Sequence, residues 1–362
     1  MDLRSFIDVL AREGYLKRVD REVDWKLELG ELVRTNQRPL LFERIKDYPG
    51  QRVFANGMSS ISTMALALGL GPLKRWRNFV TEVRKKIDAP VAPRIVESGP
   101  VLENVVQGPE INFLKFPIPQ WSKQDGGRYL GTWHINVSRD IDTGFRNIGV
   151  YRMEVLGPNQ ATISTSSNSH LGRHVAKAEK AGRALPMAVA IGASEAVVMA
   201  AAAGCPYGMD EYDLAGGLQG RGIELLKCGT VNLEVPADAE IAIEGFIKPG
   251  VRVYDGPYLD YAGKTNSNSG AFLFEAKRLM FRSNPIFRGT AVGPAGAEDH
   301  QIFSVLAHLG LFDFHGSRPK RLVQAQLIKR RLFRAFQFAG TIGWSLLSSE
   351  QSRTPPKISV NP

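Results

Sequence analysis

The chain has 362 residues, of which 43% are hydrophobic and 23% are charged, values typical of a soluble globular protein with two or three domains. The formal net charge is +10, and residues 318–334 hold seven Lys or Arg and no acidic residue. Such an excess suits an anionic, phosphate-bearing ligand about as well as nucleic acid. Because no zinc-finger spacing or aromatic-rich basic stripe accompanies it, we do not expect a nucleic-acid-binding protein.

Cysteine usage and the N-terminus both predict a cytoplasmic protein. Cys205 and Cys228 are the only cysteines and form no CxxC pair, which argues against a disulfide or thiolate–metal framework. The N-terminal MDLRSFID has charges where a signal peptide needs an apolar core. The longest apolar run, Met187–Gly204, contains Glu195, which is costly at a bilayer centre. We therefore predict a strand (Met187–Ile191), a turn and an Ala-rich helix instead of a transmembrane span.

Residues 1–88 predict a small α/β domain. Leu3, Phe6 and Leu10 follow the spacing of an amphipathic helix, and Gly14 ends it. Further helices are expected at Leu27–Asn36, Ile61–Leu68 and Trp76–Lys86, and strands at Leu40–Phe42 and Arg52–Ala55.

Residues 89–300 predict a mainly β domain, which the Pro-rich segment 89–119 enters as a linker. Its later strands are expected at Gly222–Cys228, Ala239–Ile247, Phe272–Phe281 and Ile286–Thr290, with an inserted helix near Glu211. Beyond it, residues 301–348 predict a short basic helical region and residues 349–362 a disordered tail.

The middle of the chain predicts a β-hairpin. Tyr129–Ser138 and Ile148–Leu156 alternate between apolar and polar residues, as strands do. Between them Asp140, Asp142 and Gly144 supply the residue types of a turn.

Polar side chains that a folding core does not require lie along this hairpin and after it: Asn147, Arg152 and His170. Burying them costs free energy unless each is paired, so a bound cofactor with its metal ion is our candidate partner. Asn147 and Arg152 are five positions apart and point to opposite faces of a regular strand. A bulge around Gly149, or a cofactor that straddles the strand end, would reconcile them.

The chain resembles the UbiD family of prenylated-FMN-dependent (de)carboxylases over residues 2–302. The stretches that carry the resemblance appear in family order: DLRSFIDVLAREGYLKRVDREVD, FPIPQWSKQDGGRYLG, NIGVYR, the EY of GMDEYDLAG, LEVPADAEIAIEG and DGPYLDYAG. The implied fold is mixed α/β, with a small N-terminal α/β domain and a flavin-binding split β-barrel. Family members generally continue into a further domain that mediates oligomerisation, and we expect a short form that lacks most of it, in a homo-oligomer or a heteromeric complex.

The resemblance also implies a metal and cofactor site. Asn147, His170 and Glu211 match positions that hold a divalent cation, commonly Mn²⁺, against the flavin phosphate, with K⁺ as a further candidate. The implied cofactor-binding residues are Asn147, Ile148, Gly149, Val150, Tyr151, Arg152, Ser169, His170 and Glu211. An amide oxygen, an imidazole and a carboxylate suit a cation that bridges a phosphate.

Less specific readings of these residues remain open. His170 could be an exposed polar residue in a Ser-rich segment, and His174 is the fallback ligand. Glu211 could complement a helix dipole, with Asp210 as the helix cap. Asp255 could merely initiate a turn.

Arg152, Asp255 and Asp260 match an ionic triad in which Asp260 is the proton donor. Two nearby carboxylates cannot both ionise cheaply, so one pKa should rise, while Arg152 holds the other group ionised. Gly256 and Pro257 allow a turn that could bring the two Asp residues together.

The resemblance implies reversible decarboxylation of an aromatic or α,β-unsaturated carboxylic acid. Its steps are formation of a covalent flavin–substrate adduct, loss of carbon dioxide and protonation by Asp260, and the cofactor comes from a flavin prenyltransferase. One alternative is a flavin-binding, non-catalytic or partner-dependent subunit of a multi-subunit carboxylase, joined through Leu322, Val323, Leu327 and Arg330. A second is an ordinary FMN reductase, which the metal-ligand set opposes.

Overall fold

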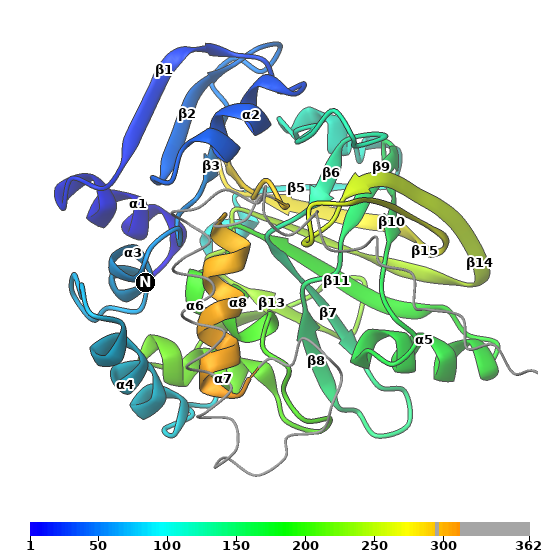
Figure 1. The fold of residues 1–362 in the computed structure, drawn as a ribbon. Coiled ribbons are helices and arrows are strands. Elements are labelled where there is room, and N and C mark those ends of the chain that lie inside the picture. Colours follow the sequence, from blue (N-terminus) through cyan, green and yellow to red (C-terminus); the bar gives the residue numbers. More distant parts are fainter. Residues whose placement is uncertain (294–296, 312–362) are drawn as a thin grey trace, which may run out of the picture. The chain divides into compact units, whose positions relative to one another are not determined.

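The computed structural model describes residues 1–293 and 297–311 (Figure 1). An N-terminal sheet has the strand order β1-β2-β3-β16. The elements of this region are α1 (Leu3–Arg12), β1 (Lys17–Val23), α2 (Glu28–Thr35), β2 (Leu40–Ile45), β3 (Arg52–Ala55), α3 (Ile61–Ala67) and α4 (Trp76–Ile87). The helices and strands predicted here are confirmed, with small shifts at their ends.

Helix α1 packs through the apolar face that its sequence predicts. The Asp2 carboxylate accepts the amide hydrogen of Ser5 and so caps the helix. Leu3, Phe6 and Leu10 are each at most 1% exposed. Full burial of such a side chain contributes about 1.5–3 kcal/mol, so this face holds α1 against its neighbours.

Strand β16 (Ile286–Arg288) lies in a different sheet from the one predicted. The sequence pattern placed it with the later β domain, but it pairs in parallel with β3, from Ile286 opposite Arg52 to Arg288 opposite Phe54. Periodicity identifies a strand without identifying its neighbour, because the pairing partner depends on tertiary packing. The chain thus returns to the N-terminal sheet after completing the larger one.

The larger sheet has the order β6-β9-β10-β15-β14-β11-β7-β8, and β5 pairs with β15. Its strands are β5 (Asn104–Gln107), β6 (Tyr129–Gly131), β7 (His134–Arg139), β8 (Arg146–Gly149), β9 (Met153–Gly157), β10 (Gln160–Ile163), β11 (Leu185–Ile191), β14 (Ile241–Leu259) and β15 (Thr265–Phe281). The predicted strand at Gly222–Cys228 is instead β12 (Glu224–Lys227), which lies in a small separate sheet between β13 (Glu234–Pro236) and β4 (Arg94–Ile95). Segment 89–119 otherwise holds the short 3₁₀ turns η1 (Pro100–Leu102), η2 (Gly108–Glu110) and η3 (Phe113–Lys115).

The predicted hairpin forms between β7 and β8, with Asp140 accepting amide hydrogens from Asp142 and Thr143 in its turn. However, each of the two predicted strands is interrupted, at residues 132–133 and 150–152. Strand β6 precedes the first break and strand β9 follows the second, and these two pair at the other end of the strand order. The two short crossings curl the sheet into a half-barrel, where the family resemblance implied a split β-barrel.

Helices cover the larger sheet and bury its faces: α5 (His170–Lys180), α6 (Glu195–Ala201), α7 (Glu211–Gln219) and α8 (Glu298–Leu309). Strand β11 shows how residue size sorts the faces. Ala188 and Ala190 join the hydrophobic cluster that contains α6 and α7, while Met187, Val189 and Ile191 join the cluster on the opposite face. The small alanines let the helices approach the sheet closely.

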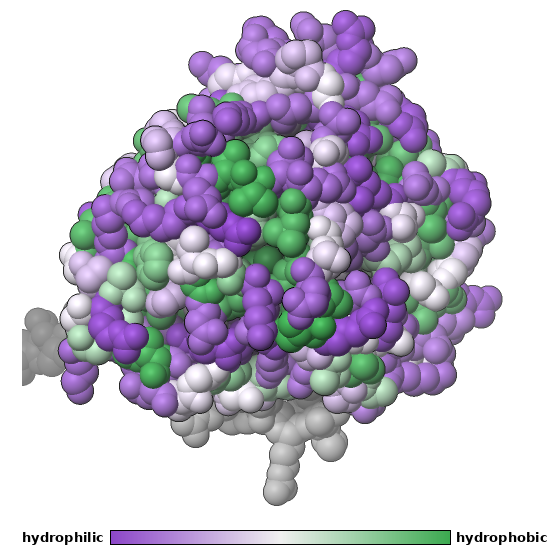
Figure 2. All heavy atoms as spheres, turned by 180° about the vertical axis from the view of Figure 1, so that it is seen from behind, coloured by the Kyte–Doolittle hydropathy of each residue, from purple (hydrophilic) through white to green (hydrophobic). Residues whose placement is uncertain are grey.

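The apolar run at 187–204 forms part of β11 and helix α6, as predicted. In the described part of the chain, no helix is long and apolar enough to cross a membrane. Figure 2 shows one face of the molecule, on which hydrophilic residues predominate around smaller hydrophobic patches. The predictions for residues 312–348, including Leu322, Val323, Leu327 and Arg330, and for the tail at 349–362 lie outside the described residues.

Candidate functional site

Three elements bring Asn147, His170 and Glu211 together. Asn147 lies on β8, while His170 and Glu211 are the first residues of α5 and α7. The Asn147 Oδ1 atom lies 3.1 Å from His170 Nδ1, which in turn lies 3.6 Å from Glu211 Oε1. The second Glu211 oxygen, Oε2, accepts the amide hydrogen of Ile148 at 3.1 Å. An amide oxygen, an imidazole and a carboxylate thus converge from segments far apart in the sequence.

Helix capping fixes the two helical members of this cluster. The Ser169 hydroxyl accepts the Gly172 amide hydrogen at the start of α5, and Asp210 accepts that of Tyr212 at the start of α7. Arg146 Nε donates to Asp210 Oδ2 at 3.1 Å and so ties α7 to β8. Asp210 is therefore the cap that the sequence predicts.

Burial makes Glu211 costly to ionise without a partner. Its side chain is 2% exposed, and burial raises its pKa, an effect that the His170 side chain and the Ile148 amide oppose. His174 is not part of the cluster: its Nδ1 hydrogen-bonds the Ser138 hydroxyl at 2.9 Å, and burial lowers its pKa to about 4. The fallback ligand is therefore directed elsewhere.

The donor types suit a hard or borderline cation, but the arrangement contains only two side chains from the group His, Cys, Asp and Glu. In residues 1–293 and 297–311, no set of three or more such side chains could by itself hold a metal ion. A cation here would need the Asn147 oxygen and further oxygens from a ligand, as phosphates provide. Metal binding at Asn147, His170 and Glu211 stays a prediction.

Residues Val150–Arg152 form the irregular crossing between β8 and β9. The Tyr151 amide donates to Asn136 Oδ1 at 3.1 Å. A Cβ on Gly149 would lie 2.5 Å from the Tyr151 ring, so only glycine fits that contact. Because the strand ends at Gly149, strand alternation does not separate Asn147 from Arg152, which resolves the mismatch in their predicted directions.

Arg152 lies in a pocket with aromatic walls. The pocket is lined by Trp121, Ser122, Asp125, Tyr129, Thr132, Arg152, Tyr258, Leu259, Thr290 and Val292. The guanidinium carbon of Arg152 is 3.5 Å from the centre of the Tyr258 ring, and its side chain makes no hydrogen bond or ion pair to another described residue. The buried Trp121 Nε1 and Thr290 Oγ1 atoms likewise have no partner there. The pocket therefore presents a cation and two polar groups that a bound molecule could satisfy.

Asp255 is buried next to this pocket. It is fully inaccessible, and its Oδ1 atom accepts a hydrogen bond from Thr162 Oγ1 at 2.7 Å, while Oδ2 has no partner among the described residues. Burial raises the pKa of Asp255, and the Thr162 hydroxyl and the charge of Arg152 oppose that rise.

Asp260 is the third residue of the expected triad. It is in the turn between β14 and β15, where its Oδ1 atom accepts the Lys264 amide hydrogen at 2.8 Å. Among the described residues, no hydrogen bond or ion pair joins Asp260 to Arg152 or Asp255. The charge of Arg152 acts on Asp255, and the proton-donor role of Asp260 stays a prediction.

Two further carboxyl groups, Asp125 and Glu154, were not predicted from the sequence. They are 8% and 7% exposed, and burial raises the pKa of each. Asp125 lines the pocket, and Arg152 acts to lower its pKa. The sequence shows Glu154 two positions after Arg152. On a predicted strand, however, an acidic residue is ordinarily expected to face solvent.

With this geometry established, the sequence matches two domains of one family. Residues 94–295 match the Rift-related domain of 3-octaprenyl-4-hydroxybenzoate carboxy-lyase (UbiD), and residues 7–83 match its N-terminal domain. The chain belongs to the UbiD family.

Named relatives include the pyrrole-2-carboxylic acid decarboxylase of Pseudomonas aeruginosa, 33% identical over 327 residues, which cover 86% of this chain and 66% of that protein. A phenolic acid decarboxylase of Bacillus subtilis is 30% identical and covers 83% and 66%. The chain thus spans slightly less than two thirds of the length of these relatives.

Solved structures show the same fold. An evolved dimeric form of the UbiD-class enzyme HmfF from Pelotomaculum thermopropionicum, in complex with prFMN, has a TM-score of 0.78 and 32% identity, over 85% of this chain and 71% of that one. The closed form of the Sedimentibacter hydroxybenzoicus vanillic acid decarboxylase has a TM-score of 0.81 and 29% identity, over 84% and 67%. The mixed α/β class and the curled sheet are therefore confirmed.

Proposed function

We propose that this protein is a carboxy-lyase that decarboxylates an aromatic carboxylic acid, reversibly, with prenylated FMN as its cofactor. The observation that carries the proposal is the unpaired Arg152 guanidinium, stacked on Tyr258 in an aromatic-walled pocket beside the buried Asp255. Flat aromatic walls complement a planar acid by stacking, and a guanidinium recognises a carboxylate by paired hydrogen bonds. Relatives named as decarboxylases of pyrrole-2-carboxylic, phenolic and vanillic acids support the reaction class.

The residues present fit a phosphate-bearing cofactor held through a cation. Asn147, His170 and Glu211 would hold Mn²⁺ or another divalent cation, and Glu211 is buried beyond what an isolated carboxylate tolerates. The irregular crossing at Val150–Arg152 would lie along the flavin, with Ile148, Gly149 and Ser169 at its ends. When bound, prenylated FMN supplies the nucleophilic carbon and the electron sink that decarboxylation requires.

The protein's own residues would place the acid and move one proton. Arg152 would bind the substrate carboxylate, and the aromatic walls formed by Trp121, Tyr129 and Tyr258 would exclude water from it. Asp260 would then return a proton to the carbon that has lost carbon dioxide. That role requires Asp260 to reach the bound substrate from the β14–β15 turn, where its carboxylate accepts the Lys264 amide hydrogen.

The cellular setting follows from the same proposal. The protein would act in the cytoplasm, obtain its cofactor from a flavin prenyltransferase, and assemble as a homo-oligomer or with a second subunit. Both cysteines are free, as a reducing compartment requires, and burial raises the pKa of Cys205 to about 12. The dimeric HmfF form supports assembly.

Co-expression with a flavin prenyltransferase tests the cofactor assignment. The purified protein should contain a flavin with the absorbance spectrum and mass of prenylated FMN, together with one divalent cation per flavin. Protein expressed without the prenyltransferase is the control and should contain plain FMN or none. Protein that holds no flavin under either condition would contradict the proposal.

A further inference from the structure

The turn between β14 and β15 is closed by Asp260 itself. The Asp260 amide donates to the Lys264 carbonyl at 2.8 Å, and the Asp260 Oδ1 atom accepts the Lys264 amide hydrogen, also at 2.8 Å. The Asp260 carbonyl accepts the Gly263 amide hydrogen at 3.0 Å. The second carboxylate oxygen, Oδ2, makes no hydrogen bond to a described residue and is available to a bound molecule. The position of this oxygen therefore depends on what holds the turn.

Asp125 joins the start of this turn to another wall of the Arg152 pocket. Its Oδ1 atom accepts the amide hydrogen of Leu259, the residue before Asp260, at 3.1 Å. Its Oδ2 atom accepts the Ser122 amide hydrogen at 2.9 Å. Leu259 and Ser122 both line the pocket, and Asp125 is 8% exposed. One buried carboxylate thus fastens two pocket walls that come from distant parts of the sequence, through hydrogen bonds of the stronger, charge-assisted kind.

The chain on both sides of Asp125 is fixed as well. Gln120 Nε2 donates to the Asp125 carbonyl at 2.6 Å. The Gly126 amide donates to the Pro257 carbonyl at 2.7 Å, and a Cβ on Gly126 would lie 2.5 Å from the Gly256 carbonyl oxygen. Only glycine allows so close an approach of the two backbones, so the loop that carries Asp125 lies directly on the last part of β14.

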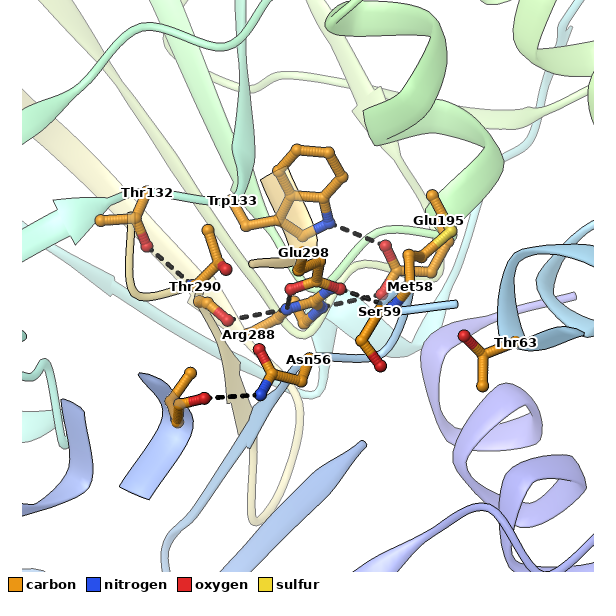
Figure 3. Close-up of polar contacts among 12 residues, drawn as sticks. Asn56, Met58, Ser59, Thr63, Thr132, Trp133, Glu195, Arg288, Thr290 and Glu298 are labelled. Atoms are coloured by element: carbon orange, nitrogen blue, oxygen red, sulfur yellow. Dashed lines mark hydrogen bonds and ion pairs between the residues drawn. The ribbon is translucent and has the colours of Figure 1, made fainter. Parts of the chain in front are cut away.

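Helix α8 holds the other side of the turn. His300 Nε2 donates to the carbonyl of Tyr261, the residue after Asp260, at 2.8 Å. The two rings stack, with their centres 4.1 Å apart and their planes at 20°. Glu298, two residues before His300, accepts a hydrogen bond from the buried Arg288 at 3.1 Å (Figure 3). Because this bond fixes the start of α8, His300 supports the turn from an anchored helix.

We propose that Asp125 and His300 are positioning residues that hold the chain immediately before and after Asp260, and so set where its carboxyl group meets the acid bound at Arg152. A general acid must lie within hydrogen-bond reach of the atom that it protonates, and a displacement of ~1 Å can slow a reaction about 100-fold. Each side chain reaches the turn from a different segment, so the two supports are independent. This role rests on the proposed decarboxylase function.

His300→Phe tests the support from α8 without a substrate. The variant keeps an aromatic ring that can stack on Tyr261 but loses the hydrogen-bond donor. In the purified full chain, the Lys264 amide, which reports directly on the Asp260 carboxylate, should exchange with deuterium about 10-fold faster than in the wild type. His308→Phe, in the last turn of the same helix, is the matched control and should leave this exchange unchanged. Wild-type exchange in His300→Phe would overturn the proposal.

Asp125→Asn tests the other support. An Asn side chain has one acceptor oxygen, so one of the two bound backbone amides loses its partner, and the loop and the turn are no longer joined through this residue. Exchange of the Lys264 amide should again rise. Asp2→Asn is the matched control, because Asp2 also accepts a backbone amide, that of Ser5, but at the start of α1. An equal rise in this control would contradict the specific role of Asp125. If Asp125→Asn does not fold, His300→Phe decides alone.

The loaded enzyme separates positioning of Asp260 from general destabilisation. His300→Phe should lower kcat about 10-fold and leave KM unchanged, because Arg152, which would bind the acid, is not altered. In an Asp260→Asn background the same change should lower kcat no further, since both changes act on one proton transfer. A further loss in that background would overturn the positioning role. If Lys264 exchange responds as expected but the loaded wild-type protein releases no carbon dioxide, the decarboxylase function fails while the two supports of the turn stand.

Discussion

Glu211 is the residue on which the metal hypothesis depends most. Glu211→Ala should lose both the cation and the flavin, because the cluster retains only an amide and an imidazole. Metal content by mass spectrometry and flavin absorbance measure both losses. The matched control is Glu31→Ala, in the first turn of α2. It removes a negative charge that stabilises the helix N-terminus by about 0.3–1 kcal/mol, and it should leave the metal in place. Wild-type metal content in Glu211→Ala would refute the ligand assignment.

The same residue predicts a pH dependence for the cofactor-free protein. Burial raises the folded-state pKa of Glu211 above its unfolded value, so stability falls as pH rises from the unfolded pKa through the folded one. A cation that pairs with the carboxylate should remove this loss. Added Mn²⁺ should therefore raise the melting temperature more at the upper end of this window than below it, and should not do so in Glu211→Ala. Equal shifts at both pH values would show that Mn²⁺ binds elsewhere.

Sequence reasoning identified Asn147, His170 and Glu211 because the resemblance supplied their grouping. Spacing alone could not, since the three come from a strand and two separate helices. Glu154 was missed because its burial depends on Gly127 and on the pairing of β6 with β9, neither of which has a local signal. For Asp260 the resemblance supplied a role but not the local structure. It did not predict the turn in which the Asp260 carboxylate accepts the Lys264 amide hydrogen.

At the scale of elements, strand β16 joins the N-terminal sheet to the rest through a buried charge network (Figure 3). Arg288 is 1% exposed; its Nε atom donates to Glu195 Oε1 at 2.7 Å and its Nη1 atom to Glu298 Oε2 at 3.1 Å. The Met58 amide donates to Glu298 at 2.6 Å, and Trp133 Nε1 donates to Glu195 at 2.7 Å. One guanidinium therefore links β16, α6 and α8, and the carboxylates extend the network to the segments on either side.

Arg288→Leu should destabilise the fold by about 3–5 kcal/mol, because it leaves two buried carboxyl groups without their cation. Denaturant unfolding followed by fluorescence measures the loss. Arg18→Leu removes an exposed pair with Glu43 and should cost about 0–1 kcal/mol. Equal costs in the two variants would show that the network contributes no more than a surface pair.

Most helices and strands followed from periodicity, but their partners did not. Helix α5 was not predicted, because Ser-rich residues precede it and His170, Gly172 and His174 interrupt the apolar pattern. The two crossings at 132–133 and 150–152 were read as continuous strand, since alternation persists through them. The curling of the sheet explains why the chain passes from β6 to β7 and from β8 to β9, which lie at opposite ends of the strand order.

For the whole molecule, the central claim is that a UbiD-family chain that spans about two thirds of its relatives' length is a decarboxylase. The most direct measurement is carbon dioxide release from a panel of aromatic carboxylic acids by protein loaded with prenylated FMN. Release should occur with at least one acid and should be absent with the FMN-loaded protein.

Asp260→Asn completes that measurement. The variant preserves size and should still fold and retain metal and flavin, yet it should turn over at least ~10²-fold more slowly, because it lacks a transferable proton. Solvent deuterium exchange at the product carbon should slow with it. No carbon dioxide from any acid, in protein whose bound cofactor is verified by mass, would contradict the central claim, and a wild-type rate in Asp260→Asn would remove Asp260 from the reaction.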